Sequence, residues 1–461
     1  MKKEDIDELE VRIISIETIK PLTPTPSHLK TYTLSLVDQI HPPYYSTMLL
    51  FYPNTIETRP GGIDIVGLKS SLSETLSKFY LFAGRCNDDF TVSCNDQGIP
   101  FIETRVDCRL YDFLTSSNKL DNMNKLTPPQ EFMTDKPMSE RVPLVFQVNV
   151  FSCGGVVIGC FKFHKLLLDG TSLVGFLKHW AAVTASEHDP VVAPDFDAVL
   201  SAFPPCRTLD WQPFDFNCPE YQAMIQQCKS VRVVAKSFVF TKQALSELKA
   251  KAASKEVPKP TRTEALAGFI WEHCLAAAHA TGAMPMGPDP SVMSILVNMR
   301  PRLNPPLANA SMGNLITTAT ARAKKGMGQM ELVREIHTAI TNVSERIDSY
   351  KEGQNIEGLV GDIGPINWYN KAGMYVVSSW CQFGMDEIDF GFGKPKWASP
   401  SNGVESLTSR NDIYFVVDSS GDGIEVWIYL EEVEMQILER NEQFRTYTFP
   451  DSISLREDDF I

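Results

Sequence analysis

Residues 156–185 constrain the fold more than any other part of the chain. They start as an apolar run, residues 156–161, with the composition of a buried strand. Beyond a short Leu-rich segment, the apolar residues recur at the spacing of an amphipathic helix: Leu173, Phe176, Leu177 and Trp180. The strand therefore meets His164 where the backbone turns. We expect this strand end to hold the histidine firmly while leaving it open to a cleft.

His164 is a candidate general base. A lone histidine beside apolar residues is more often structural, but a strand delivers this one to a turn with a carboxylate, Asp169, close by. Neutral imidazole has a pKa near the working pH, as a general base requires. Asp169 has a second interpretation as the helix N-cap, which contributes about 0.5–2 kcal/mol. Thr171 or Ser172 could cap the helix instead, leaving Asp169 free for another partner.

Size and composition bound the class of protein. A chain of 461 residues predicts two or three domains. The net charge of −14 argues against a general nucleic-acid binder. No apolar run approaches the length of a membrane span, and the acidic N-terminus has the features of neither a transit peptide nor a secretion signal. The ten cysteines show no metal-like spacing and indicate reduced thiols in the cytosol.

The succession of strand-like and helix-like segments predicts a mixed α/β chain in two halves of similar size. Residues 191–228 are rich in Pro, Asp and aromatic residues, and we interpret them as a crossover between an N-terminal domain, residues 1–190, and a C-terminal domain, residues 229–461. Two local patterns give further expectations. The turn at 95–98 predicts a hairpin between the strands on either side of it. Residues 329–350 predict one long helix.

The common competing sites are missing from the sequence. It has no GxSxG elbow, no Walker A loop and no HExxH or Cys/His metal pattern. Gly391 and Gly393 flank Phe392 but lack the third glycine and the following helix of a dinucleotide loop, so taken alone they indicate a tight turn.

Together these pieces resemble the BAHD family of plant acyl-CoA-dependent acyltransferases along nearly the whole chain. Its two signatures, HxxxD(G) and DFGWG, are represented by residues 164–170 and 389–393. Supporting matches lie at 79–85, 263–266, 298–300 and 421–427. Residues 94–98 and 378–381 look most like the members that acetylate hydroxyls of alkaloids.

The resemblance implies two chloramphenicol-acetyltransferase-like domains, each a mixed sheet flanked by helices, with a channel between them. The segment at about 374–400 would pack with the N-terminal domain. His164 would take the hydroxyl proton of an alcohol as its oxygen attacks the thioester of acyl-CoA, most simply acetyl-CoA. Ser378 and Trp380 match positions that help to stabilise the oxyanion, where a donor contributes about 2.7–4 kcal/mol.

The resemblance also implies structural roles and a simple assembly. The motif Asp would pair with Arg300, and Asp389, Gly391 and Gly393 would be structural and away from the active centre. The expected ligands are the two substrates, acyl-CoA and a small-molecule alcohol. The expected enzyme is a monomer that needs no metal or bound cofactor and binds neither nucleic acid nor a membrane. The C-terminal half would gather positive charge for CoA, with Lys236 and Arg262 as candidates among five basic residues that include Lys242, Arg300 and Arg302.

Two departures from the family pattern matter. Four residues separate His164 from Asp169 where the family has three, so counted strictly Leu168 stands in the Asp position. A one-residue insertion within 166–168 is the simplest account, and a bulge there would let Asp169 keep its arginine at a cost of about 1–3 kcal/mol in local strain. Phe392 replaces the family's Trp. The alternatives are therefore an active O-acyltransferase, a relative that has lost acyl transfer or performs another reaction such as cyclisation, and a non-catalytic scaffold.

Overall fold

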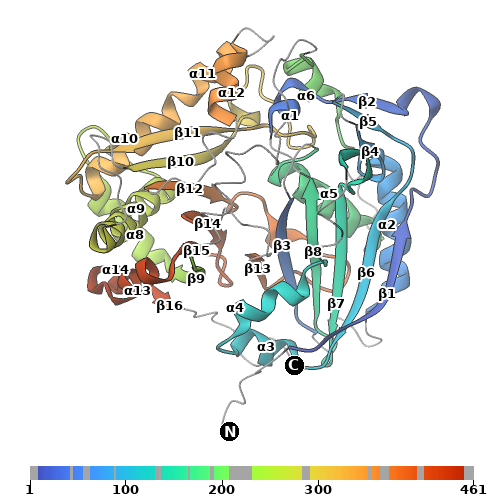
Figure 1. Cartoon of the computed structure of the whole chain (residues 1–461), viewed down its shortest axis with the longest axis horizontal. Coiled ribbons are helices and arrows are strands. Elements are labelled where there is room, and N and C mark those ends of the chain that lie inside the picture. Colours follow the sequence, from blue (N-terminus) through green and yellow to red (C-terminus); the bar gives the residue numbers. More distant parts are fainter. Residues whose placement is uncertain are drawn as a thin grey trace.

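The structure is a computed structural model of the chain and describes residues 9–41, 45–54, 63–87, 90–129, 132, 137–164, 167–186, 192–206, 231–282, 291–350, 355–363, 373–401 and 410–450. Within these residues it has a six-stranded and a seven-stranded sheet side by side, as Figure 1 shows, with a smaller three-stranded sheet. The mixed α/β architecture in two halves predicted from the sequence is confirmed.

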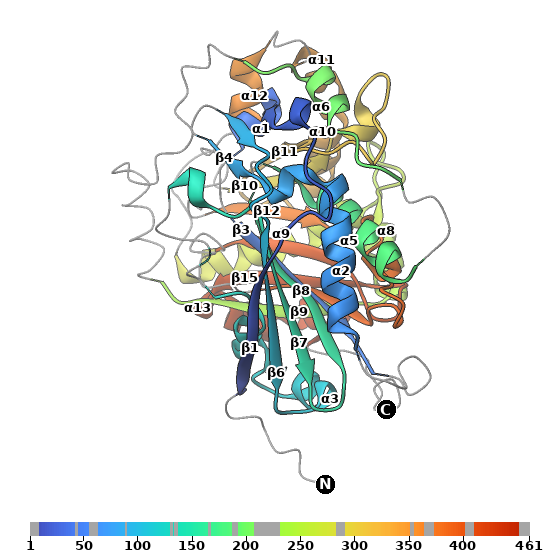
Figure 2. The same ribbon diagram turned by 90° about the vertical axis from the view of Figure 1, so that its right-hand side faces the viewer.

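The first sheet carries the strand that ends at His164. Its strand order is β1-β6-β7-β8-β3-β13, and β6 and β7 are parallel. The bounds are β1 Val11–Ile19, β6 Ile99–Val106, β7 Leu144–Phe151, β8 Val156–His164, β3 Tyr45–Tyr52 and β13 Trp397–Pro400. Helices α2 (Ile65–Lys78) and α5 (Gly170–Thr184) pack together against one face, visible at the front of Figure 2. The ring of Phe146 on β7 lies 4.9 Å from that of Trp180 on α5, so α5 packs onto the core of the first half.

The second sheet has the order β11-β10-β12-β14-β15-β9-β16. The bounds are β11 Ile316–Ala323, β10 Ser291–Asn298, β12 Met374–Ser379, β14 Asp412–Val417, β15 Ile424–Glu431, β9 Val233–Phe240 and β16 Phe449–Pro450. Helices cover its outer face on the left of Figure 1: α8 Lys242–Ala252, α9 Arg262–Thr281, α10 Gln329–Thr341, α13 Glu432–Arg440 and α14 Glu442–Tyr447. The other α-helices in the described part of the chain are α1 Leu36–Ile40, α3 Leu110–Thr115, α4 Lys119–Asn122, α6 Asp197–Ala202, α11 Val343–Tyr350 and α12 Ile356–Ile363.

The two halves interlock. The late strand β13 joins the first sheet, pairing Trp397 with Phe51 of β3, whereas β12 lies in the second sheet, so the segment predicted to pack with the first domain divides between the sheets. Conversely, the early helix α1 buries Leu36, Val37 and Ile40 in the core of the second half. The domain boundaries themselves stay a prediction.

Two local expectations are wrong. Strand β5 (Thr91–Ser93) pairs with β2 (Thr31–Thr33) and β4 (Arg85–Cys86), whereas β6 pairs with β1 and β7, so the turn at 95–98 joins two sheets and makes no hairpin. The predicted long helix ends at Asn342 and continues as α11. Of the predicted crossover, residues 191 and 207–228 lie outside the described residues, as does the acidic tail 451–461.

Candidate active site

The turn after β8 positions the candidate base. His164 is the last residue of β8, and its backbone pairs with Tyr45 of β3. The side chain of His164, and residues 165 and 166 entirely, lie outside what the structure describes. Leu167 and Leu168 follow, 5% and 0% exposed, inside the core of the first half. The two leucines that precede Asp169 and the start of α5 are therefore packed in the core of the first half.

Asp169 is the N-cap of α5 and carries out a second task as well. Its Oδ1 accepts a hydrogen bond from the backbone N–H of Ser172 at 2.9 Å, which satisfies one of the free donors of the first helical turn. Its Oδ2 accepts from the backbone N–H of Leu315 at 3.1 Å. The two carboxylate oxygens also face the guanidinium of Arg300, at 2.7 and 3.2 Å. The cap and the arginine pair, which the sequence offered as alternatives, therefore coexist.

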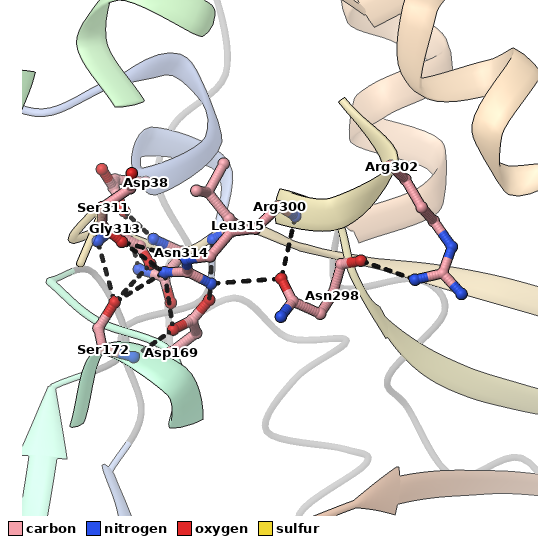
Figure 3. A network of polar contacts seen from close by, with 10 residues as sticks. All are labelled: Asp38, Asp169, Ser172, Asn298, Arg300, Arg302, Ser311, Gly313, Asn314 and Leu315. Carbon is pink, nitrogen blue, oxygen red and sulfur yellow. Dashed lines mark hydrogen bonds and ion pairs between the residues drawn. The ribbon is translucent and has the colours of Figure 1, made fainter. Parts of the chain in front are cut away.

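Arg300 completes a buried polar network between the halves, shown in Figure 3. It belongs to the short helical turn Arg300–Arg302 that follows β10. Its Nη2 donates to Ser172 Oγ at 2.9 Å, to Ser311 O at 2.8 Å and to Gly313 O at 3.2 Å, and its Nε donates to Ser311 O at 3.1 Å. Both Asp169 and Arg300 are 0% exposed. A buried ion pair is tolerated only with such complete satisfaction of its donors and acceptors.

Asp38 adds a carboxylate that sequence reasoning missed. It lies on α1, where Ser35 Oγ donates to its Oδ2 at 2.6 Å. The backbone N–H and side-chain amide of Asn314 both donate to its Oδ1, at 2.7 and 2.9 Å. Burial raises the pKa of Asp38 to about 6, the hydrogen bonds from Ser35 and Asn314 offset part of the rise, and the nearby Asp169 charge adds to it. No sequence signal distinguishes this residue from an ordinary acidic residue in a first helical turn.

Ser378 and Trp380 lie together at the end of β12. The indole Nε1 of Trp380 donates to Ser378 Oγ at 3.1 Å, and the Trp380 backbone N–H donates to Phe415 O of β14 at 2.7 Å. The following turn reaches α5, because a Cβ on Gly170 would lie 2.6 Å from the ring of Phe383. The end of β12 is thus packed beside the first turn of the helix that follows the His164 motif.

Asp389, Gly391 and Gly393 form a packed turn at the opposite end of α5. Asp389 Oδ1 accepts from the backbone N–H groups of Gly391 and Gly393 at 2.8 and 2.9 Å, and both glycines have positive φ, 86° and 98°. A Cβ on Gly391 would lie 3.3 Å from Cα of Ala185, which is sixteen residues beyond Asp169, or about 24 Å along the helix. Phe392 packs against Tyr52 with ring centroids 5.2 Å apart. This turn is therefore remote from the end of β8.

The basic residues predicted to contact CoA do not lie together. Arg262 starts α9, and its Nη1 donates to Asp422 O at 3.4 Å, close to Lys242, whose Nζ lies 3.3 Å from Asp422 Oδ1. Arg262 is also near enough to Cys381 to lower the pKa of that thiol, although burial raises it overall. Lys236 instead lies 3.5 Å from Glu439 on α13. Arg262 and Lys242 therefore lie together beside the turn between β14 and β15, whereas Lys236 lies elsewhere, against α13.

Within the described part of the chain, no group of three His, Cys, Asp or Glu side chains is arranged to hold a metal ion. The described helices include none that is both long enough and apolar enough to cross a membrane.

The comparisons with known proteins cover nearly the full length of the chain. The Transferase family model matches residues 9–445. Akuammiline synthase 2 of Alstonia scholaris is 33% identical over 453 residues, which cover 96% of this chain and 97% of that protein. Stemmadenine O-acetyltransferase of Catharanthus roseus is 32% identical over 435 residues, covering 93% and 96%. The crystal structure of vinorine synthase, a Rauvolfia serpentina protein, matches with a TM-score of 0.76 at 29% identity, over 95% of this chain and 98% of that one.

Proposed function

Because the chain belongs to the BAHD branch of the Transferase family and is an acyltransferase of groups other than aminoacyl groups, we propose that it transfers an acetyl group from acetyl-CoA to a hydroxyl of an alkaloid or related specialised metabolite. The observation that carries the proposal is the buried pair of Asp169 and Arg300, which holds the turn behind His164 although that turn is one residue longer than the family pattern. Relatives that act on alkaloids support the acceptor class.

In this proposal His164 is the general base. It takes the proton of the acceptor hydroxyl as the oxygen attacks the thioester carbonyl of acetyl-CoA. The tetrahedral oxyanion then collapses, the carbon–sulfur bond breaks, and the imidazolium returns its proton to the departing CoA thiolate. The products are the acetyl ester and free CoA thiol.

Ser378 and Trp380 are the proposed stabilisers of the oxyanion. The Ser378 oxygen already accepts a hydrogen bond from the Trp380 indole, so its own O–H is available to another acceptor. A donor aimed at developing negative charge lowers the barrier by about 2.7–4 kcal/mol. The packing of the turn after β12 against Gly170 supports a position beside the His164 motif.

Coenzyme A would enter a channel between the halves from the edge of the second sheet where β12 ends. Arg262 is the better-supported contact, because it lies at that edge near Cys381 and beside Lys242. Lys236 stays a predicted contact, although it faces Glu439 of α13. The enzyme would act as a monomer in the cytosol without a bound cofactor.

The test is release of CoA thiol by the purified protein with acetyl-CoA and a panel of alkaloid alcohols. His164→Ala should abolish the release while His279→Ala, on α9, leaves it unchanged. Release that persists in His164→Ala would show that another group is the base. A full panel without thiol release, with the biological product unchanged in His164→Ala, would favour the alternative of a lost or altered reaction such as cyclisation.

A further inference from the structure

The inner face of the second sheet carries a partly exposed strip. Residues of β12 and β14 alternate, and Val377 and Phe415 point to the helix-covered core with 0% exposure. On the opposite face Ser378, Asp412 and Tyr414 are partly exposed. Tyr414 and the adjacent Trp380 also pack against the core of the first half. Solvent therefore reaches the second sheet along a strip where the two halves meet.

Asp412 lies in this strip among aromatic rings. The hydroxyl of Tyr414 donates to Asp412 Oδ2 at 3.5 Å. The ring of Tyr414 lies 5.3 Å from that of Trp380 and 5.8 Å from that of Tyr429, both edge to face. Asp412 is also close enough to Tyr429 to add to the rise that burial causes in the pKa of that phenol. The side chain of Tyr414 thus contacts Asp412 through its hydroxyl and both Trp380 and Tyr429 through its ring.

This carboxylate has no cationic partner among the residues that the structure describes. The described ion pairs include none with Asp412. Burial raises the pKa of Asp412 to about 7, and the hydrogen bond from Tyr414 offsets only part of the rise. The site therefore disfavours the charged form of Asp412, and a bound cation would offset that cost and favour the carboxylate. The faces of Trp and Tyr rings attract cations too, which makes the combination typical of ammonium recognition.

On the premise of the function proposed above, we propose that Asp412, with the rings of Trp380 and Tyr414, binds the protonated amine of the acceptor. The acceptors are then alcohols that carry a basic nitrogen. Tyr414 pairs with Ser378 across the ladder and Asp412 pairs with Val376, so Asp412 lies two residues, or about 7 Å, along the strand from the Ser378 position. Arg262 lies near Cys381, so along the strand direction the Ser378 position lies between Asp412 and Arg262.

The test compares probes of equal shape and different charge on the full-length protein. The N-methyl quaternary salt of quinuclidinol keeps a positive charge at every pH. The bicyclooctanol that carries a methyl group on the corresponding bridgehead carbon is its neutral carbon isostere. Calorimetry should show the salt binding at least about tenfold more tightly than the isostere. Asp412→Asn should remove that preference without weakening the binding of bicyclooctanol, and Asp412→Glu should restore part of it. Glu387→Gln, which removes a surface partner of Lys178, is the matched control and should change neither.

Equal binding of the two probes by the wild type, binding of neither, or a preference that survives in Asp412→Asn overturns the proposal. Acetyl transfer gives a second readout: with quinuclidinol as acceptor, Asp412→Asn should raise KM about tenfold or more with kcat nearly unchanged. If no acceptor yields CoA thiol but the Asp412-dependent preference for the cation remains, the acetyltransferase proposal fails and the cation site stands. The reverse result removes the cation site alone.

Discussion

Asp169 and Arg300 face each other through both oxygens of the carboxylate and both terminal nitrogens of the guanidinium, with neither side chain exposed to solvent. Asp169 is the N-cap of α5 in the first half, and Arg300 begins the short helical turn after β10 in the second half. The pair therefore anchors the start of α5, which follows the His164 motif in sequence, to the other half of the molecule.

Removing one partner of this pair should destabilise the protein strongly. In Arg300→Met the Asp169 carboxylate stays buried without its counter-ion, and we expect a loss of about 3–5 kcal/mol in the free energy of unfolding. Urea unfolding followed by tryptophan fluorescence measures it. Arg302→Met is the control, because Arg302 is partly exposed and donates to Asn298 O at 2.9 Å. Equal losses in the two variants would show that the buried pair has no special weight.

Asp38 should make stability depend on pH. The pKa of an unperturbed aspartate is 3.8, and the pKa of Asp38 in the folded protein is about 6. Folding therefore disfavours the charged form of Asp38, relative to the protonated form, by about 3 kcal/mol. The folded state therefore holds more protons than the unfolded state between about pH 4 and 6, so the free energy of unfolding falls as the pH rises through this window. Asp38→Asn should lack this fall and gain stability relative to the wild type from about pH 4 to pH 7, as thermal melts across that range would show.

Asp96→Asn is a control with the opposite sign. Burial alone would raise the pKa of Asp96, but hydrogen bonds from Lys30 and Thr25 together hold it below its usual value. Stability from this group is present above its unfolded pKa and is lost as the pH falls through the folded one. Asp96→Asn should therefore lose stability relative to the wild type as the pH rises. A shift of the same sign in both variants would contradict the assignment for Asp38.

The burial of Asp38 shows where prediction from the sequence ends. Local patterns located strand β8, helix α5 and the capping role of Asp169, because these depend on residues close together in the chain. The resemblance supplied the partner of Asp169. The position of Asp38 depends on α1 crossing into the core of the other half, which no local periodicity encodes.

The failed hairpin at 95–98 has a similar cause. The backbone does turn at Gly98, which has a positive φ of 84°. The pairing was decided by distant segments, because β1 and β2 offered partners to β6 and β5 in different sheets. Asp96 in this turn is held by Thr25 and Lys30, more than sixty residues away in sequence. Local turn propensity fixes backbone angles, whereas long-range packing selects the strand partner.

Ser378→Ala should impair chemistry more than binding. Loss of an oxyanion donor lowers kcat by about 10²–10³ and leaves the KM for acetyl-CoA nearly unchanged. Thiol release under saturating acetyl-CoA measures both. The neighbouring Ser379→Ala is the control, because side chains alternate along β12 and Ser379 lies on the other face from Ser378. A fall in kcat of equal size in both variants would remove Ser378 from the proposed role.

Asp389→Ala should lower stability without changing kcat. The variant loses the two hydrogen bonds to the backbone of Gly391 and Gly393, an expected loss of about 1–3 kcal/mol. Because this turn lies at the far end of α5, thiol release per folded molecule should match that of the wild type. A large drop in kcat at a temperature where the variant is folded would show that the turn takes part in the reaction.

Shortening the leucine run tests the register of the His164 motif. Residues 166–168 are all Leu, so deleting any one of them gives the same variant, with three residues between the histidine and the aspartate as in the family. Two leucines remain for the buried positions of Leu167 and Leu168, and we expect the Asp169 pair to survive. Melting temperature and thiol release should equal or exceed those of the wild type.

Leu168→Ala is the control. It keeps the length of the motif but empties a buried position, and its free energy of unfolding should fall by about 2–5 kcal/mol. A deletion variant that melts like the wild type but releases no thiol would show that the extra residue belongs to the working geometry of this enzyme.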